Sequence, residues 1–195
     1  QELAEKYNIL QAAMASSERL FNLLDTAPAI AAPARPNSPA RRGEIEFQNV
    51  SFSYDGKTPV LKNVSFKVPA GQTAALVGHT GAGKTSILSL LLRLYDADSG
   101  NILVDGVDVR EYDPGELRTR FGTVFQDVQL FTGSVADNIG LRRERKAEAL
   151  ERAAKLVNAE CLISRLPGGM AADLSERGSA LSSGERQLLS FARAL

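Results

Sequence analysis

The stretch GHTGAGKT, residues 78–85, places glycines, a lysine and a hydroxyl side chain at the spacing of a phosphate-binding loop. Its glycines let the backbone curl closely enough for consecutive amide N–H groups to converge on an anion. Lys84 is placed to reach the β and γ phosphates of a nucleotide, and Thr85 to offer its hydroxyl to Mg²⁺. We therefore predict a site for a nucleotide, such as ATP, with Mg²⁺, and expect Lys84 to take part in catalysis.

The context of the loop favours this prediction over an ordinary glycine-rich turn. The apolar run TAALVG, residues 73–78, precedes it as a buried strand would, and KTSILSLLLRLY continues it with helical character. His79 is interpreted as exposed or near the nucleotide, with catalysis the less favoured role. The expected nucleotide-binding residues of this segment are Gly78, His79, Thr80, Gly81, Ala82, Gly83, Lys84, Thr85 and Ser86. Such a loop alone is compatible with kinases, GTPases, helicases and transporters.

Two further stretches select among these classes. LSSGERQ, residues 181–187, closely resembles the LSGGQ signature of ABC ATPases, and FARAL after it resembles the helix that follows in that family. VFQD, residues 124–127, lies between the two motifs in the family's order. The resemblance runs from about Gly43 to Leu195, and its details favour the exporter branch. It implies an α/β fold, a P-loop NTPase (RecA-like) core with an antiparallel β subdomain and an α-helical signature subdomain.

The resemblance also assigns roles to single residues. Tyr54 matches the aromatic that stacks on adenine, although a strand tyrosine that packs locally is an open alternative. Gln126 matches the Q-loop glutamine, which joins the Mg²⁺ shell, responds to the γ-phosphate and belongs to the catalytic machinery. The signature binds the γ-phosphate held by a partner subunit, through Ser182, Ser183, Gly184 and Glu185. Two ABC nucleotide-binding domains, in a homodimer or a heterodimer, are therefore expected to enclose two nucleotides.

The signature departs from the family pattern at two positions. Ser183 replaces a glycine, so a Cβ restricts the backbone there. Glu185 replaces a glutamine and adds a negative charge close to an anionic ligand. Both changes could weaken the composite site, and a heterodimer with one impaired site stays open.

The sequence predicts three segments. Residues 1–26 repeat apolar or small residues on a heptad and are expected to be a helix that packs on a partner, or else an amphipathic helix packed on its own domain. Residues 27–42 are a proline-rich linker. The resemblance implies that the helix at 1–26 continues from a transmembrane domain and that residues 43–195 are the N-terminal portion of an ABC nucleotide-binding domain. DLSERGSA, residues 173–180, resembles the exporter loop that touches the transmembrane domain and retains Glu176, Arg177 and Gly178. The implied location is the cytoplasmic face of the plasma (inner) membrane, within an integral membrane transporter.

Local patterns predict further elements. Asp55-Gly56 and Asp105-Gly106 each indicate the turn of a hairpin. GTVFQ, residues 122–126, is typical of a short strand, and the segment from Ser134 to about Leu166 is mostly helical, with Ser134 as an N-cap. Cys161, the single cysteine, is expected to be a buried structural thiol.

Composition limits the function classes. Lys plus Arg and Asp plus Glu number 23 each, so no basic excess favours nucleic acid as a partner. With 195 residues and 44% hydrophobic content, the chain can bury the core of one ordinary domain. Its N-terminus lacks the pattern of a signal peptide, and no apolar run approaches the roughly 20 residues that cross a bilayer.

Hydrolysis in this family needs a Walker B strand that ends in Asp-Glu and a switch histidine. Residues 1–195 contain no Asp-Glu dipeptide, and the single histidine is His79 in the loop. Asp105 follows an apolar run, but it belongs to a hairpin signal and precedes the Q-loop, so we reject it as the Walker B aspartate. We expect the sequence to stop before Walker B, so that these residues alone show at most trace hydrolysis and expose an apolar sheet edge. The alternatives are a soluble ABC ATPase acting on DNA or ribosomes, and a catalytically dead regulatory module that still binds nucleotide.

Overall fold

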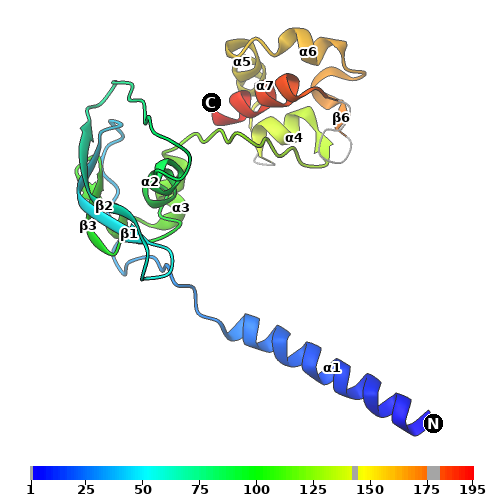
Figure 1. Ribbon diagram of the computed structural model, residues 1–195. Coiled ribbons are helices and arrows are strands. Elements are labelled where there is room, and N and C mark those ends of the chain that lie inside the picture. Colours follow the sequence, from blue (N-terminus) through cyan, green and yellow to red (C-terminus); the bar gives the residue numbers. More distant parts are fainter. Residues whose placement is uncertain (1, 142–144, 175–180) are drawn as a thin grey trace. The chain divides into compact units, whose positions relative to one another are not determined.

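The computed structural model describes residues 2–141, 145–174 and 181–195 (Figure 1). It divides into two compact units, residues 1–114, here called the sheet unit, and residues 115–195, here called the helical unit. The exporter-like loop at Glu176, Arg177 and Gly178 lies outside the described residues.

The sheet unit contains a four-stranded antiparallel sheet in the order β2-β1-β3-β4 (Figure 1). The strands are β1 (Ile45–Ser53), β2 (Pro59–Val68), β3 (Ser99–Val104) and β4 (Val107–Asp108). Strands β1 and β2 form the hairpin predicted at Asp55-Gly56, and β3 and β4 form the one predicted at Asp105-Gly106. Both hairpin predictions are confirmed.

The hairpin at Asp105 also holds the end of the proline-rich segment. Asp105 and Gly106 have φ values of 51° and 81°, as a type I′ turn requires. The Oδ1 atom of Asp105 accepts backbone N–H bonds from Arg42, Gly43 and Glu44, at 3.1, 2.8 and 3.0 Å. Asp105 is thus a turn residue that fixes the approach to β1, which agrees with its rejection as a Walker B residue.

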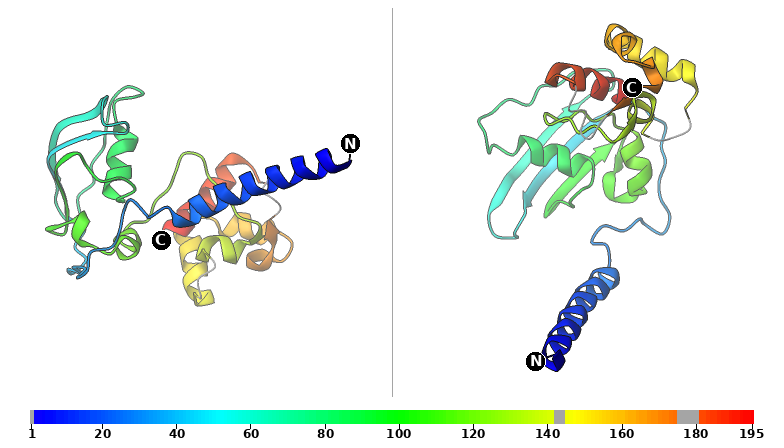
Figure 2. Two further views of the ribbon diagram at one scale, coloured as in Figure 1. Left: turned by 90° about the horizontal axis from the view of Figure 1, so that it is seen from below. Right: turned by 90° about the vertical axis from the view of Figure 1, so that its right-hand side faces the viewer.

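Helix α2 (Lys84–Leu91) lies over one face of this sheet (Figures 1 and 2). Strand β1 buries Phe47, Val50 and Phe52, with a register shift between Phe47 and Val50 that brings both to the same face, and Ile87 and Leu90 are buried on α2. The helix that carries the end of the phosphate-binding loop is therefore anchored through its apolar face.

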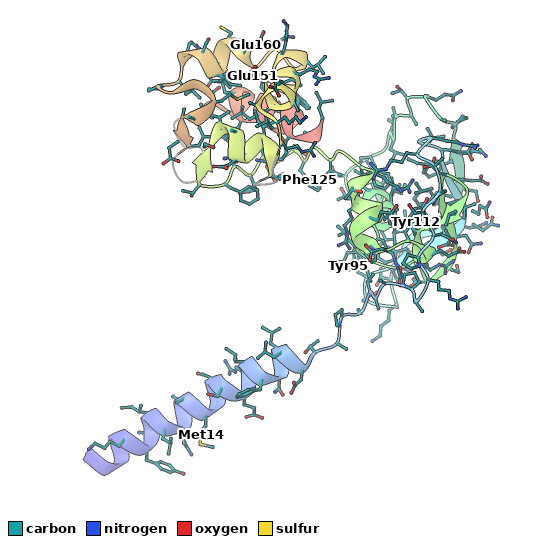
Figure 3. All side chains as sticks on the ribbon, turned by 180° about the vertical axis from the view of Figure 1, so that it is seen from behind. Met14, Tyr95, Tyr112, Phe125, Glu151 and Glu160 are labelled. Carbon is teal, nitrogen blue, oxygen red and sulfur yellow. The ribbon has the colours of Figure 1, made fainter. Side chains whose placement is uncertain are left out.

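Helix α1 (Glu2–Asp25) confirms the predicted N-terminal helix, and the segment that follows it, up to Glu44, is irregular (Figure 1). Its heptad side chains Tyr7, Leu10, Met14 and Phe21 are exposed, and Met14 is labelled in Figure 3. Within the described ranges, no helix has both the length and the apolar character needed to cross a membrane.

The helical unit is built around helix α7 (Ser183–Ala194), which packs against α4 (Val135–Gly140) and α5 (Ala147–Leu156). A capping box begins α4, because Ser134 Oγ accepts the N–H of Asp137 at 3.0 Å, so the predicted N-cap is confirmed. The other elements of this unit are α3 (Pro114–Thr119), β5 (Gly133–Ser134), α6 (Glu160–Arg165), β6 (Asp173–Leu174) and the 3₁₀ turn η2 (Gly169–Ala171), whereas the 3₁₀ turn η1 (Val109–Glu111) belongs to the sheet unit. The core of this unit includes Leu130, Val135, Ile139, Ala154, Leu162, Leu174, Leu181 and Leu189.

The structure corrects three predictions. The run 73–78, expected as a buried strand, and the run 122–126, expected as a short strand, are both irregular and exposed, and Val77 has 94% of its surface exposed. A strand needs neighbours for its backbone hydrogen bonds, and no described strand pairs with either run. Cys161 is exposed rather than buried, because α6 turns its neighbours Leu162 and Ile163 toward the core instead.

Asn138 joins the elements of the helical unit through its buried amide. The residue is 1% exposed, and its side chain accepts the N–H of Phe131 and donates to the carbonyl oxygens of Phe131 and Ser134, at 2.8 to 3.0 Å. The Arg193 guanidinium, from α7, donates to the backbone carbonyl and to Oδ1 of Asn138, at 2.9 and 3.1 Å. The α7 helix is therefore tied to α4 by a satisfied polar cluster.

Replacing Asn138 by alanine removes these bonds and leaves buried polar groups without partners. We expect Asn138→Ala to lower the free energy of unfolding by about 2–3 kcal/mol, because each orphaned buried group costs about 1–3 kcal/mol. Urea denaturation monitored by circular dichroism measures the change. Gln187→Ala, which removes an exposed amide from α7, is the control and should change stability by less than about 0.5 kcal/mol. Equal effects of the two variants would contradict the role given to Asn138.

Candidate functional site

The phosphate-binding loop depends on its glycines. Gly81 and Gly83 have φ values of 86° and 84°, in the left-handed region that side chains rarely adopt. A Cβ atom on Gly83 would lie 2.6 Å from Leu61 Cδ2 and 3.4 Å from the carbonyl oxygen of Val60. The loop thus packs its backbone directly against the start of β2, which only glycine permits, and it leads straight into α2.

The Lys84 side chain is hydrogen-bonded to the backbone of its own loop. Its ammonium group donates to the carbonyl oxygens of Gly78 and His79, at 2.7 and 2.8 Å, and the Ala82 N–H donates to the same carbonyl of His79 at 3.2 Å. Phosphate oxygens are also acceptors, so they would compete for the same ammonium protons. The lysine and the glycines that the sequence predicts to bind phosphate therefore lie close together in this loop.

The donor set suits a nucleotide that brings its own Mg²⁺. No group of three or more His, Cys, Asp or Glu residues that could hold a metal occurs in the described parts of the chain. Mg²⁺ is commonly held by one or two protein ligands together with substrate phosphates and water, and Thr85 offers an exposed hydroxyl at the first turn of α2. Thr85 belongs to the sheet unit and Gln126 to the helical unit, so their joint Mg²⁺ shell stays a prediction.

His79 is exposed, as one of the two expectations for it required. Its ring Nδ1 lies 2.8 Å from the carbonyl oxygen of the next residue, Thr80. This contact holds the exposed imidazole against the backbone of its own loop. Its proximity to nucleotide remains a prediction.

Tyr54 directly follows β1 and comes close to the phosphate-binding helix. Its hydroxyl lies 3.0 Å from the hydroxyl of Ser86 on α2, and 53% of its surface is exposed. The next residue, Asp55, accepts the backbone N–H groups of Lys57 and Thr58 and so shapes the turn, and these bonds lower the pKa of its carboxyl. The structure therefore brings the candidate base-stacking ring and the phosphate loop together within one unit.

In the helical unit, a polar hollow of about 370 Å³ brings Gln126 and the signature residue Ser183 together. Residues 126–129 form one part of its lining, and Ser183, Arg186 and Gln187 of α7 form the other. Gln126 itself is exposed. The Q-loop and the signature helix, far apart in sequence, thus share one surface of this unit.

The signature residues form the N-terminus of α7 through a capping box. Glu185 accepts the N–H and the hydroxyl of Ser182, both at 2.8 Å, and the Glu185 N–H donates to Ser182 Oγ at 3.3 Å. Arg165 donates to the other carboxylate oxygen of Glu185 at 2.9 Å. Hydrogen bonds from Ser182 and the nearby charge of Arg165 lower the pKa of Glu185. Glu185, which departs from the family pattern, therefore bonds the Ser182 hydroxyl that was expected to bind a phosphate.

Sequence reasoning missed two of these contacts. Arg165, in α6, carries no motif that ties it to Glu185, and Tyr95, which contacts Tyr54, follows α2 without a recognisable pattern. The capping box itself was detectable, because Ser182 and Glu185 stand at the S-x-x-E spacing. Ser183 and Gly184 lie in the first turn of α7, and both are exposed.

Comparisons with known proteins agree with this geometry. Residues 61–195 match the family model described as ABC transporter, so the chain belongs to the ABC transporter family. It is 40% identical over 194 residues to a fatty acid ABC transporter ATP-binding/permease protein of Mycobacterium bovis, covering 99% of this chain and 31% of that protein. It is 43% identical over 188 residues to an ATP-dependent lipid A-core flippase of Vibrio vulnificus, covering 95% of this chain and 32% of that protein.

A solved structure of a bacterial Atm1-family ABC exporter with ATP bound is also similar. It has a TM-score of 0.85 and 36% sequence identity, and the match covers 96% of this chain and 34% of that one. The α/β fold of an ABC ATPase domain and the resemblance to the exporter branch are therefore confirmed. The chain spans about a third of the length of the curated relatives it matches.

The capping box leads to a pH-dependent stability of the helical unit. Because the folded state lowers the pKa of Glu185, its contribution is present above the ordinary pKa of a glutamate and is lost as the pH falls through the folded pKa. We expect Glu185→Ala to be less stable than the native chain at pH 7, with the difference shrinking below about pH 4. Urea titrations at several pH values measure it. Glu151→Ala, at an exposed position of α5 labelled in Figure 3, should show no such trend. A pH-independent effect of Glu185→Ala would contradict this assignment.

Proposed function

We propose that the chain is the ATP-binding domain of an ABC exporter, in which MgATP binding and hydrolysis between two such domains drive export of a substrate. The observation that carries this proposal is the closed phosphate loop, with Lys84 inside it and Tyr54 linked to the same helix through Ser86. The relatives named above, a fatty acid transporter and a lipid A-core flippase, support the exporter class.

Each group of residues has a distinct part in this proposal. Tyr54 stacks against adenine, while the loop amides and Lys84 bind and orient the phosphates. Thr85 and Gln126 hold Mg²⁺, which, when bound, offsets charge on the phosphates. Gln126 and Lys84 also act in catalysis, and Ser182 to Glu185 present the N-terminus of α7 to the nucleotide of a partner domain.

The partners follow from the same proposal. A second nucleotide-binding domain, identical or different, completes each nucleotide site. The exposed heptad side chains of α1 and the irregular segment after it support a connection to a transmembrane domain at the cytoplasmic face of the membrane. Residues 1–195 contain no Asp-Glu dipeptide, so we expect at most trace hydrolysis from these residues alone.

A catalytically silent, nucleotide-binding module is the second candidate. The contact that favours it is the hydrogen bond from the Ser182 hydroxyl to Glu185. It occupies that hydroxyl and places a negative carboxylate where it would repel a phosphate. A silent module would bind MgATP yet gain no turnover when mixed with a normal partner domain. An active exporter domain would gain turnover in the same mixture.

The phosphate loop is tested by Lys84→Ala. We expect the affinity for MgATP to fall at least about tenfold while the fold is kept, because a hydrogen bond to a charged group contributes about 1.5–3 kcal/mol. Isothermal titration calorimetry measures the affinity, and circular dichroism checks the fold. Lys62→Ala, which removes an exposed ammonium from β2, is the matched control and should bind normally. Unchanged affinity in Lys84→Ala would refute the assignment of the loop.

The two-domain arrangement is tested by association in the presence of MgATP. We expect a non-hydrolysable ATP analogue to raise the dimer fraction in sedimentation velocity. Glu185→Gln should raise it further, by a few fold, because glutamine can still cap the helix but no longer repels phosphate. Absence of nucleotide-dependent association in both forms, at concentrations where the nucleotide binds, would count against a two-domain site.

A further inference from the structure

Tyr54 is one member of a cluster of three aromatic rings in the sheet unit. Its ring centroid lies 4.8 Å from that of Phe52 and 5.1 Å from that of Tyr95, with interplanar angles of 77° and 89°. Phe52 and Tyr95 are also in contact, at 5.7 Å. Such edge-to-face contacts stabilise both the position and the tilt of a ring. Two neighbours therefore fix the Tyr54 ring while about half of its surface stays exposed.

The hydroxyl of Tyr54 is fixed as well. It is hydrogen-bonded to the hydroxyl of Ser86, which is only 5% exposed and lies in the first turn of α2. Because Ser86 follows Lys84 and Thr85 on the same helix, this bond joins the candidate base-binding ring to the phosphate-binding loop. Ser86 was expected from the sequence to bind nucleotide, and its buried hydroxyl is instead bonded to Tyr54.

The chain reverses direction after α2, and this reversal places Tyr95 in contact with Tyr54. Arg93 has a φ of 47°, in the left-handed region, and so ends the helix and reverses the chain. Its buried guanidinium donates to Asp96 at 3.0 Å and to the carbonyl oxygens of Arg110 and Tyr112, at 3.2 and 3.4 Å. Tyr95 and Tyr112 are both labelled in the sheet unit of Figure 3. The position of Tyr95 is therefore set by a cluster that does not include the phosphate loop.

We propose that Tyr95 and Ser86 are positioning residues that hold Tyr54 in place for the adenine base. This inference rests on the proposed function, in which Tyr54 stacks on the base. A ring that is already oriented loses less side-chain entropy when a ligand binds, so the base binds more tightly for the same contact. Tyr95 acts through the ring of Tyr54, and Ser86 acts through its hydroxyl.

The proposal separates binding of the base from binding of the phosphates. The decisive measurement is the affinity of the full chain for MgATP and for magnesium tripolyphosphate, which carries phosphates but no base. Tyr95→Ala should weaken MgATP binding by about three- to tenfold, the range expected from freeing one ordered side chain. It should leave tripolyphosphate binding unchanged. Tyr95→Phe keeps the ring and should restore the affinity for MgATP.

The hydroxyl link has its own test, which does not depend on the stability of Tyr95→Ala. Tyr54→Phe and Ser86→Ala each remove one end of the same bond. Each should weaken MgATP binding by a similar factor and leave tripolyphosphate binding unchanged, and the double variant should weaken MgATP binding no more than either single one. Independent, multiplying effects in the double variant would overturn the link.

The remaining outcomes distinguish this inference from the proposed function. If Tyr54→Ala weakens MgATP binding but Tyr95→Ala does not, the positioning role of Tyr95 is wrong and the base contact stands. If Tyr54→Ala has no effect, the base contact itself is wrong. Equal losses for MgATP and tripolyphosphate in Tyr95→Ala would mean that the ring supports α2 as a whole, which also overturns the inference. Tyr7→Ala, an exposed tyrosine on α1, is the control and should bind both ligands normally.

Discussion

Strand β1 is hydrogen-bonded along both of its edges, to β2 and to β3, and the sheet unit depends on this double pairing. The pairing satisfies the backbone of β1, and the register shift between Phe47 and Val50 lets Phe47, Val50 and Phe52 all enter the core. Tyr54 follows directly at the end of the strand, so its place beside α2 is set by the sheet rather than by the turn. The phosphate loop is placed in the same way, because Gly83 packs on the start of β2.

The helical unit is organised by a polar contact instead. Asn138 is buried and fully engaged, and Arg193 connects it to the C-terminal half of the signature helix. The contact takes the charge of Arg193 partly out of water, and this burial lowers the pKa of its guanidinium. At the other end of the same helix, Glu185 caps the first turn and Arg165 pairs with it. The first turn of the signature helix is thus capped within the unit, and the Glu185 carboxylate bonds the Ser182 hydroxyl that is proposed to meet a phosphate.

These two units explain why some site residues were predictable and others were not. The loop from Gly78 to Thr85 and the capping box at Ser182 and Glu185 are local, because their function needs only neighbours in sequence. Tyr95 and Arg165 act through contacts formed by chain reversal or helix packing, so no local pattern identifies them. The predicted pairing of Gln126 with Thr85 belongs to neither unit alone and remains a prediction.

The sequence by itself determined the elements that depend on short-range preferences. Positive φ values at Asp105 and Gly106 make a hairpin, and Ser134 begins α4 because its hydroxyl caps the next turn. Only the tertiary structure decided which apolar segments are buried. The run 73–78 has strand composition but no described neighbour to pair with, and Cys161 faces outward because Leu162 and Ile163 face the core. Burial requires partners from elsewhere in the chain, and a local pattern cannot say whether those partners are in place.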